Sequence, residues 1–424
     1  MDFSTIFAMR MLLDYKWRAL AVLWGAYFIL QGTRQIYGAT LPQISVDMHA
    51  ADVQMGMVAS VFFLAYAVSV PFGGLAADFF RRKWVIVCGT ALFVTGVFAA
   101  SYVTSVWMMV LTYGVLNGVG QSLVPTPSTA IIQQLHRESR ATALSVYQLA
   151  AYAGVILCSV TSGWLGSLGP GGWRRAFMVF GGIGLLWTLV LALGLRDTPA
   201  EGSAGNAPSA FSGSVGEAVR SVLTKPSAVL MTFVFGLGNF GDIGFRTWMP
   251  TFLQRTYEGM TPAAAAFHAV FWFYMGGFAG ILAASRISDG WRRRGNPCAR
   301  IDCNAIGHVL CALAIVAIAM CAGRLAALAA ALVVYGFVHG FYDANFIASF
   351  YEVITPRYRA SAYGMFAAGG FLIGALAPAV LGWMGEAFSL RTAFLMLCVF
   401  YILAATLTIV VRRCFFEHDY IREG

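Results

Sequence analysis

Charged residues are scarce in this sequence. Asp, Glu, Lys and Arg make up 11% of its 424 residues, whereas a soluble domain contains about a quarter. Hydrophobic residues reach 59%, and the mean hydropathy is +0.72. This balance excludes an ordinary soluble domain and is typical of a chain that crosses a membrane several times.

Motifs of catalysis and metal binding are also missing. The sequence has no phosphate loop of the form Gly-x-x-x-x-Gly-Lys-Ser/Thr, so we expect no use of ATP. Cys298 and Cys303 lie beside a basic loop without a histidine at ligand spacing, and the other cysteines fall in or next to apolar segments. We therefore expect free thiols, no metal, no cofactor and no enzymatic activity.

Apolar stretches of about 20 residues, the length that a helix needs to cross a bilayer, recur along the whole chain. The first stretch is too long for a secretory signal peptide and lacks a small-residue cleavage site, so we expect it to act as its own insertion signal. We predict an all-α membrane protein with twelve transmembrane helices, at 19–42, 53–77, 84–102, 106–134, 141–166, 175–195, 227–254, 263–287, 301–321, 325–352, 360–384 and 391–411.

The distribution of Lys and Arg predicts the orientation. The net charge of +9 comes from short basic clusters between the apolar segments, which indicates topology signals and no nucleic-acid partner. Of 28 basic residues, 21 fall on the side of the two termini and 5 on the other side. We expect both termini in the cytoplasm and the chain in the cell membrane as a monomer. The two remaining basic residues, Arg34 and Arg246, lie inside predicted spans.

The two halves of the chain repeat each other. Residues 196–226 are rich in Gly, Ala, Ser and Pro and predict a flexible linker, with a short amphipathic helix near 214–224, between domains at 1–195 and 227–424. YGVLNGVGQS (113–122) aligns with YGFVHGFYDA (335–344) at an offset of 222, Gly163 with Gly382 at 219, and Pro42 with Pro250 at 208. Such repeats place a substrate site at their interface, near the bilayer midplane.

One loop carries a family resemblance. GLAADFFRRK (74–83) resembles the major facilitator superfamily signature Gly-x-x-x-Asp-Arg-x-Gly-Arg-Arg/Lys, although Phe79 and Arg81 depart from it. The resemblance implies two pseudo-symmetric six-helix bundles and secondary transport by alternating access. We expect a cytoplasmic gate formed by Gly74, Asp78, Arg82, Lys83, Asp289, Arg293, Arg294, Glu352, Arg140 and Arg359. The basic residues among them could instead be topology signals alone.

Ionisable residues at membrane depth are costly, and they mark candidate functional sites. Arg34 lies 16 residues after Arg18, roughly 24 Å along a helix. The offset of 208 relates Arg34 to Asp242, and Arg246 lies one turn further on. The offset of 222 relates Asn117 and Gln121 to His339 and Asp343. Four helices therefore aim polar groups at one level.

Each of these residues also has a structural interpretation. Asp242 and Arg246 could form an ion pair within one helix, His339 could be a packed, hydrogen-bonded histidine, and Asn117 and Gln121 could bond between helices. Arg34 is least compatible with a purely structural role, because an arginine cannot lose its proton. The candidate substrate-binding residues are Arg34, Tyr37, Asn117, Gln121, Asp242, Arg246, His339 and Asn345. The candidate proton-coupling residues are Asp343, His339 and Asp242.

The first helix suggests a substrate class. GTRQIYGATLPQI (32–44) is similar to the first helix of the organic-anion branch of the superfamily, the sialin-like symporters and organophosphate antiporters, in which an Arg binds the anionic group. The resemblance implies a proton-coupled transporter of a small organic anion. A transporter of a sugar or a zwitterion, or an exporter of drugs or lipids, is the alternative.

Overall fold

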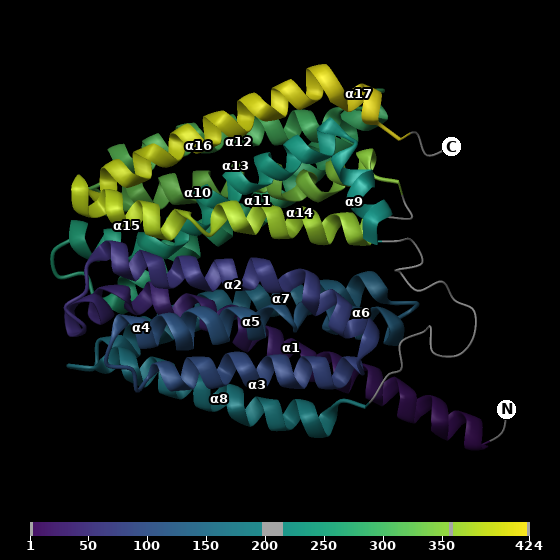
Figure 1. Ribbon diagram of the computed structural model, residues 1–424, viewed down its shortest axis with the longest axis horizontal. Coiled ribbons are helices and arrows are strands. Elements are labelled where there is room, and N and C mark those ends of the chain that lie inside the picture. Colours follow the sequence, from purple (N-terminus) through teal and green to yellow (C-terminus); the bar gives the residue numbers. More distant parts are fainter. Residues whose placement is uncertain (1–2, 197–214, 356–358, 422–424) are drawn as a thin grey trace.

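The computed structural model describes residues 3–196, 215–355 and 359–421, and most of these residues are helical. The first half of the chain forms one bundle, drawn in purple to teal in Figure 1. Its helices are α1 (Phe3–Asp47), α2 (Asp52–Phe79), α3 (Arg82–Ala100), α4 (Val106–Met109), the π-helical segment η1 (Val110–Leu116), α5 (Asn117–Ser122), α6 (Pro125–Leu135), α7 (Arg140–Gly166) and α8 (Gly172–Gly194).

The second half forms a second bundle beside the first, drawn from teal through green to yellow (Figure 1). A short helix, α9, lies where the sequence predicts one, whereas residues 197–214 of the predicted linker lie outside the described residues. The helices of this half are α9 (Val215–Leu223), α10 (Pro226–Thr256), α11 (Pro262–Arg293), α12 (Ala299–Met320), α13 (Leu325–Val353), α14 (Arg359–Gly374), α15 (Ala377–Ala387), α16 (Leu390–Val410), η3 (Val411–Phe415) and α17 (Phe416–Asp419).

The helices confirm the predicted all-α fold with twelve crossings. Ten spans in the described residues are long and apolar enough to cross a membrane. The first and fourth predicted segments complete the twelve. In α1, the polar residues Gln31, Arg34 and Gln35 lower the hydropathy of the segment. The fourth crossing is divided among α4, η1, α5 and α6, with Pro125 at the start of α6.

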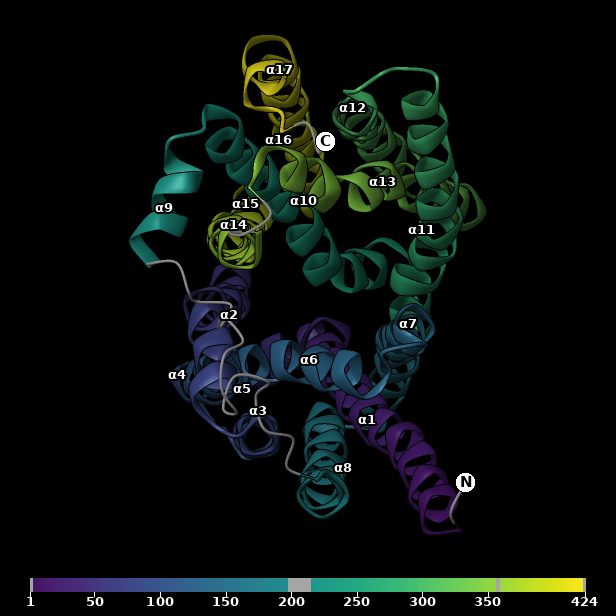
Figure 2. The same cartoon turned by 90° about the vertical axis from the view of Figure 1, so that its right-hand side faces the viewer.

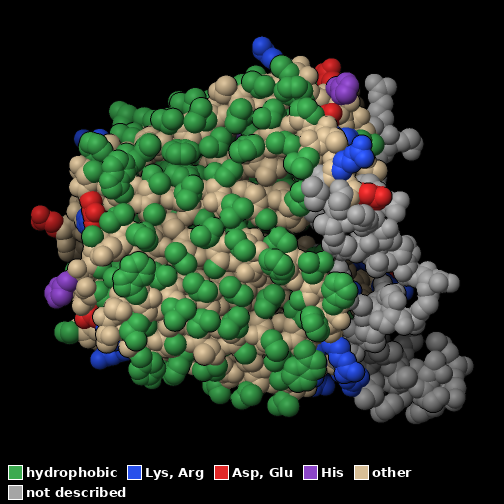
Figure 3. Space-filling view, in the orientation of Figure 1, with side chains coloured by type: hydrophobic (Ala, Val, Ile, Leu, Met, Phe, Trp, Pro, Cys, Tyr) green, Lys and Arg blue, Asp and Glu red, His purple; other side chains and the backbone are tan. Residues whose placement is uncertain are grey.

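The outer surface has the polarity that a bilayer requires. Figure 3 shows hydrophobic side chains over the middle of the molecule, with charged side chains gathered at its two ends. One end, here called the terminal end, is where α1 begins and α17 ends (Figure 1). The opposite end is called the distal end. In the view along the bundles, the two halves lie one above the other (Figure 2).

At the distal end, glycines let the backbones of the two halves touch. A Cβ added to Gly163 would lie 2.6 Å from the carbonyl oxygen of Pro262, and one added to Gly382 would lie 2.5 Å from that of Asp52. Gly163 and Gly382 are the pair related by the repeat. The first contact joins α7 to α11 and the second joins α15 to α2, so the same approach is built twice.

Polar contacts also join the halves at the distal end. The carboxylate of Asp52, at the start of α2, accepts two hydrogen bonds from the guanidinium of Arg255, near the end of α10, at 2.5 and 2.7 Å. Beside it, Gln43 donates to Gln254 at 3.1 Å. Asp52 is buried, whereas the Arg255 side chain is 46% exposed. This distal ion pair and the glycine contacts hold the distal end closed.

We expect Asp52→Asn to open the distal end more often. The variant loses the negative charge of a bidentate pair whose arginine is half exposed. The free energy that favours the closed distal end should fall by about 1 kcal/mol, which raises the population of the open form about fivefold. The measurement is the rate at which a membrane-impermeant maleimide labels Gln43→Cys, quantified at residue 43 by peptide mass spectrometry. Asp47→Asn is the matched control, because Asp47 pairs with Arg174 within one half at the same end. Equal labelling in both variants would contradict a role in closure.

Candidate functional site

A cavity of about 400 Å³ lies between the two bundles. Its walls come from both halves, since α1, α2 and α7 face α10, α11, α13 and α14 across it. The predicted residues Arg34, Tyr37, Asp242, Arg246, His339 and Asp343 all line this cavity. The repeat therefore brings the intramembrane charges together around one space.

Arg34 lies on the wall formed by the first half. Its Nε donates to Oε1 of Gln121 at 2.5 Å, and its guanidinium carbon lies 4.6 Å from the ring centroid of Tyr66. Among the described residues, no carboxylate forms an ion pair with Arg34. Because this cation cannot be neutralised by deprotonation, it presents an uncompensated positive charge to the cavity.

Gln121 and Asn117 lie behind Arg34 and do not line the cavity. The Nε2 of Gln121 donates to Oδ1 of Asn117 at 2.9 Å and to Oγ1 of Thr33 at 3.1 Å. Both amides are fully buried. They follow directly after η1, and π-helical segments are frequent at functional sites because they change the direction in which later residues point. The geometry makes Gln121 a positioning residue for Arg34.

The wall formed by the second half carries a network of charged groups. Arg246 forms an ion pair with Asp242 one turn away on α10, and its Nη1 donates to the hydroxyl of Tyr274 at 2.8 Å. His339 Nε2 lies 3.5 Å from Asp242 Oδ1 and 2.7 Å from the hydroxyl of Tyr342. The charge of Arg246, unlike that of Arg34, is compensated within its own half.

Asp343 differs from the other acidic residue in the cavity. Its side chain is exposed to the cavity, and it forms neither an ion pair nor a hydrogen bond with the rest of the described chain. Its neighbour on the helix, His339, turns to Asp242 instead. Among the described residues that line the cavity, Arg34 of the first half and Asp343 of the second therefore form no ion pair.

Two predicted site residues have structural contacts. The hydroxyl of Tyr37 donates to the carbonyl of Met55 at 2.7 Å. Nδ2 of Asn345 donates to the carbonyl of Phe341 at 3.0 Å, and Asn345 does not line the cavity. Sequence reasoning missed Gln31 and Asn239, which both line it. The offset of 208 that relates Arg34 to Asp242 also relates these two, so the repeat contained the signal.

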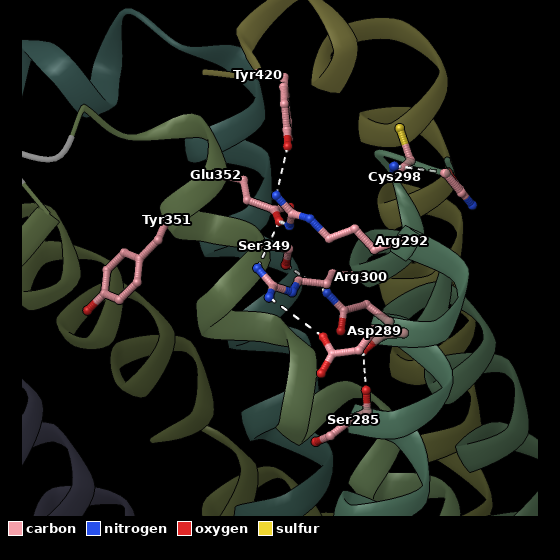
Figure 4. A network of polar contacts seen from close by, with 12 residues as sticks. Ser285, Asp289, Arg292, Cys298, Arg300, Ser349, Tyr351, Glu352 and Tyr420 are labelled. Carbon is pink, nitrogen blue, oxygen red and sulfur yellow. Dashed lines mark hydrogen bonds and ion pairs between the residues drawn. The ribbon is translucent and has the colours of Figure 1, made fainter. Parts of the chain in front are cut away.

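At the terminal end, Glu352 is the centre of a polar cluster (Figure 4). Its Oε1 accepts from Arg300 at 2.8 Å and also binds Arg292. Arg300 lies 3.9 Å from Asp289. These partners come from α11 and α12, so the cluster lies within the second half. Arg293 and Arg294 are exposed and form no ion pair with other described residues.

The gate residues of the first half lie apart from this cluster. Arg82 Nη1 donates to Gln134 at 3.2 Å, and the ammonium of Lys83 lies 5.3 Å from the ring centroid of Trp84. Arg140 is exposed, and a Cβ at Gly74 would meet no atom within 4 Å. The side chain of Asp78 lies outside the described residues. In the second half, Arg359 Nε donates to the carbonyl of Tyr351 at 3.2 Å.

The last described residues bind to this end of the second half. The hydroxyl of Tyr420 accepts from Arg292 at 3.0 Å, and Ile421 N–H donates to the carbonyl of Glu352 at 2.9 Å. Lys225 Nζ donates to the carbonyls of Val353, at 2.6 Å, and Asp419, at 3.2 Å. Burial lowers the pKa of Lys225, against the opposing effect of Asp419. The chain after the linker and the tail are thus fixed to the same bundle.

Comparison with known proteins identifies the family. The model of the Major Facilitator Superfamily matches residues 23–298 and 299–417. The chain belongs to this superfamily. It is therefore a multi-pass membrane protein of a family of transporters for small molecules, as the signature at the end of α2 and the start of α3 indicates.

Curated relatives in the superfamily are distant. The human protein spinster homolog 1 is 28% identical over 229 residues, which cover 52% of this chain and 43% of that protein. A probable chloroplastic anion transporter of rice is 25% identical over 260 residues, covering 55% and 49%. A probable sulfoacetate transporter of Cupriavidus necator is 30% identical over 182 residues, covering 42% and 41%. The matched region thus spans less than half the length of each.

Solved structures show the same fold over nearly the whole chain. A bacterial homolog of the human lysosomal transporter spinster, in an inward-facing and unoccupied conformation, superposes with a TM-score of 0.83 at 20% identity, covering 97% of this chain and 99% of that one. A D-xylose–proton symporter superposes with a TM-score of 0.73 at 12% identity, covering 93% and 97%.

We expect Arg34 and Gln121 to be energetically coupled. Gln121→Leu keeps the volume of the side chain but removes the acceptor of the Arg34 Nε, so a double-mutant cycle with Arg34→Met should give a coupling of about 1–3 kcal/mol. The measurement is the free energy of unfolding of the four proteins in detergent. Ser349→Ala, which removes a buried hydrogen bond to Asn304 in the other half, is the control and should show no coupling to Arg34→Met. Additive effects of Gln121→Leu would contradict the assigned role.

Proposed function

We propose that the protein is a secondary active transporter that moves a small organic anion, bearing a carboxylate or phosphate, by alternating access. The observation that carries this proposal is the guanidinium of Arg34, which faces the cavity and forms no ion pair with a carboxylate of the described chain. A guanidinium binds carboxylates and phosphates through paired hydrogen bonds, and the anion would supply the missing charge. The rice anion transporter and the sulfoacetate transporter among the relatives support this substrate class.

We further propose that transport is coupled to protons through Asp343, with His339 and Asp242 beside it. A negative charge on Asp343 opposes the entry of an anion into the same cavity, and protonation removes this repulsion. Arg246 is held by Asp242, so it does not offset Asp343 directly. In this proposal the cell membrane is the site of action, both termini lie in the cytoplasm, and the transporter works as a monomer.

A specific observation favours a second candidate, a zwitterionic substrate. Neither Arg34 nor Asp343 forms an ion pair within the described residues, and they come from opposite walls of one cavity. A molecule with an anionic and a cationic group could contact both. In that case Asp343 binds the cationic group of the substrate and is not a proton carrier.

We expect organic anions such as sulfoacetate to raise the melting temperature of the purified protein, because a ligand that binds only the folded state stabilises it by mass action. Arg34→Gln should weaken this binding by about 10- to 100-fold, the value of a charge-assisted hydrogen-bonded pair. Arg34→Lys keeps the charge but not the paired hydrogen bonds, so its affinity for the anion should lie between those of the native protein and Arg34→Gln. Arg174→Gln, which removes an arginine outside the cavity, is the control. Stabilisation by anions that is unchanged in Arg34→Gln would overturn the proposal.

The pH dependence of binding distinguishes the two candidates. If Asp343 carries the proton, anion affinity should increase as the pH falls, and Asp343→Asn should bind with the low-pH affinity at every pH. His339 and Asp242 line the same cavity. If some pH dependence of the affinity remains in Asp343→Asn, adding His339→Gln tests whether it arises from the His339–Asp242 pair. If Asp343 instead binds a cationic group, Asp343→Asn should lose amino-bearing anions selectively and keep simple anions. The measurement is isothermal titration across a pH series.

A further inference from the structure

Among the described residues, two aromatic contacts join the halves at the level of the cavity. Tyr66 on α2 packs edge-to-face on Phe371 of α14, with ring centroids 5.3 Å apart and an interplanar angle of 79°. Tyr152 on α7 packs edge-to-face on Tyr274 of α11, at 5.7 Å and 80°. Each contact has one ring in each half. Edge-to-face pairs of this kind are favourable beyond the area that they bury.

The two contacts are related by the internal repeat. Tyr274 lies 208 positions after Tyr66, and Phe371 lies 219 positions after Tyr152. These are the offsets that relate Pro42 to Pro250 and Gly163 to Gly382. The pair Tyr66–Phe371 thus becomes the pair Tyr274–Tyr152 when the halves are exchanged, so the same contact is built on both sides of the cavity.

Each contact is attached to a cavity arginine. The guanidinium of Arg34 lies over the ring of Tyr66, at 4.6 Å from its centroid. Arg246 donates to the hydroxyl of Tyr274 at 2.8 Å. The groups that face the substrate are therefore one contact away from the rings that join the halves. This arrangement differs from the distal ion pair, which has no contact with the cavity charges.

We propose that Tyr66 and Tyr274 are positioning residues that couple occupancy of the cavity to separation of the halves. The proposal rests on the proposed function for its ligand, an anion bound to Arg34. An anion on the guanidinium weakens its attraction to the face of Tyr66, because the charge that attracts the ring is compensated. The contact of Tyr66 with Phe371 then loosens, and α2 and α14 separate more readily. The ligand shifts the equilibrium because it changes a contact that differs between conformations.

The first arm of the test needs no ligand. We expect Tyr66→Leu to raise the maleimide labelling rate of Gln43→Cys about two- to tenfold, because one of the contacts holding the halves together is lost. Tyr66→Phe keeps the ring, so Gln43→Cys should be labelled at the same rate in this variant as in the protein with the native Tyr66. Phe371→Leu breaks the contact from the other half and should reproduce the rise. Phe98→Leu removes a ring that packs edge-to-face on Tyr102 within one half and is the control.

The second arm adds sulfoacetate as the probe. In the native protein it should raise both the melting temperature and the labelling rate. In Tyr66→Leu it should still raise the melting temperature but no longer change the labelling rate, and Tyr66→Phe should restore the response. A labelling response that survives in Tyr66→Leu, or ligand-free labelling unchanged in Tyr66→Leu and Phe371→Leu, would overturn the inference. Failure of sulfoacetate to bind the native protein counts against the proposed function, and the ligand-free arm then decides the inference alone.

Discussion

The site depends on an arginine at membrane depth, Arg34, that pairs with no carboxylate among the residues that the structure describes. A guanidinium in a low-dielectric environment needs a counter-charge, hydrogen bonds or an aromatic face. In the described part of the first half, Arg34 receives a hydrogen bond acceptor from Gln121 and an aromatic face from Tyr66, but no counter-charge. The buried amides of Asn117 and Gln121, and the π-helical segment that precedes them, serve to hold this one cation in place. In the proposed function, the counter-charge comes from the anion that binds in the cavity.

The interface between the halves follows a different physical rule. At the distal end it is made by backbone contact, which only glycine permits at Gly163 and Gly382. Closely packed backbones have little freedom to deform, so the halves are expected to move as rigid bodies. The distal ion pair orients this contact and, because Arg255 is half exposed, contributes only about 1 kcal/mol. An interface of this kind can break and re-form without unfolding either bundle.

Much of the fold was predictable from the sequence, because hydrophobic length and the repeat are long-range signals. The same offsets predicted that Arg34, Asp242 and Asp343 approach one another. The contact partners were not predictable. Arg255 counts as a topology signal in the sequence, and its pairing with Asp52 depends on how two helix ends meet. Tyr66 and Tyr274 carry no residue-type signal among 33 Phe and 17 Tyr. Asp343, His339 and Asp242 were grouped as proton-coupling residues from the repeat, but the short distance between His339 and Asp242, on two different helices, was not predictable.

Two arginines and two aspartates line the cavity, but they are not arranged as two equivalent pairs. Asp242 and Arg246 compensate each other on one helix, and their separation does not change when the halves move. Arg34 and Asp343 belong to different halves, so the energy of their interaction with each other and with a ligand depends on conformation. A ligand shifts a conformational equilibrium only through interactions that differ between the states. In the proposed mechanism, the groups that convert binding into movement are therefore Arg34 and Asp343, together with the rings that connect Arg34 to the opposite half. The ion pair on α10 sets the shape of the wall beside them.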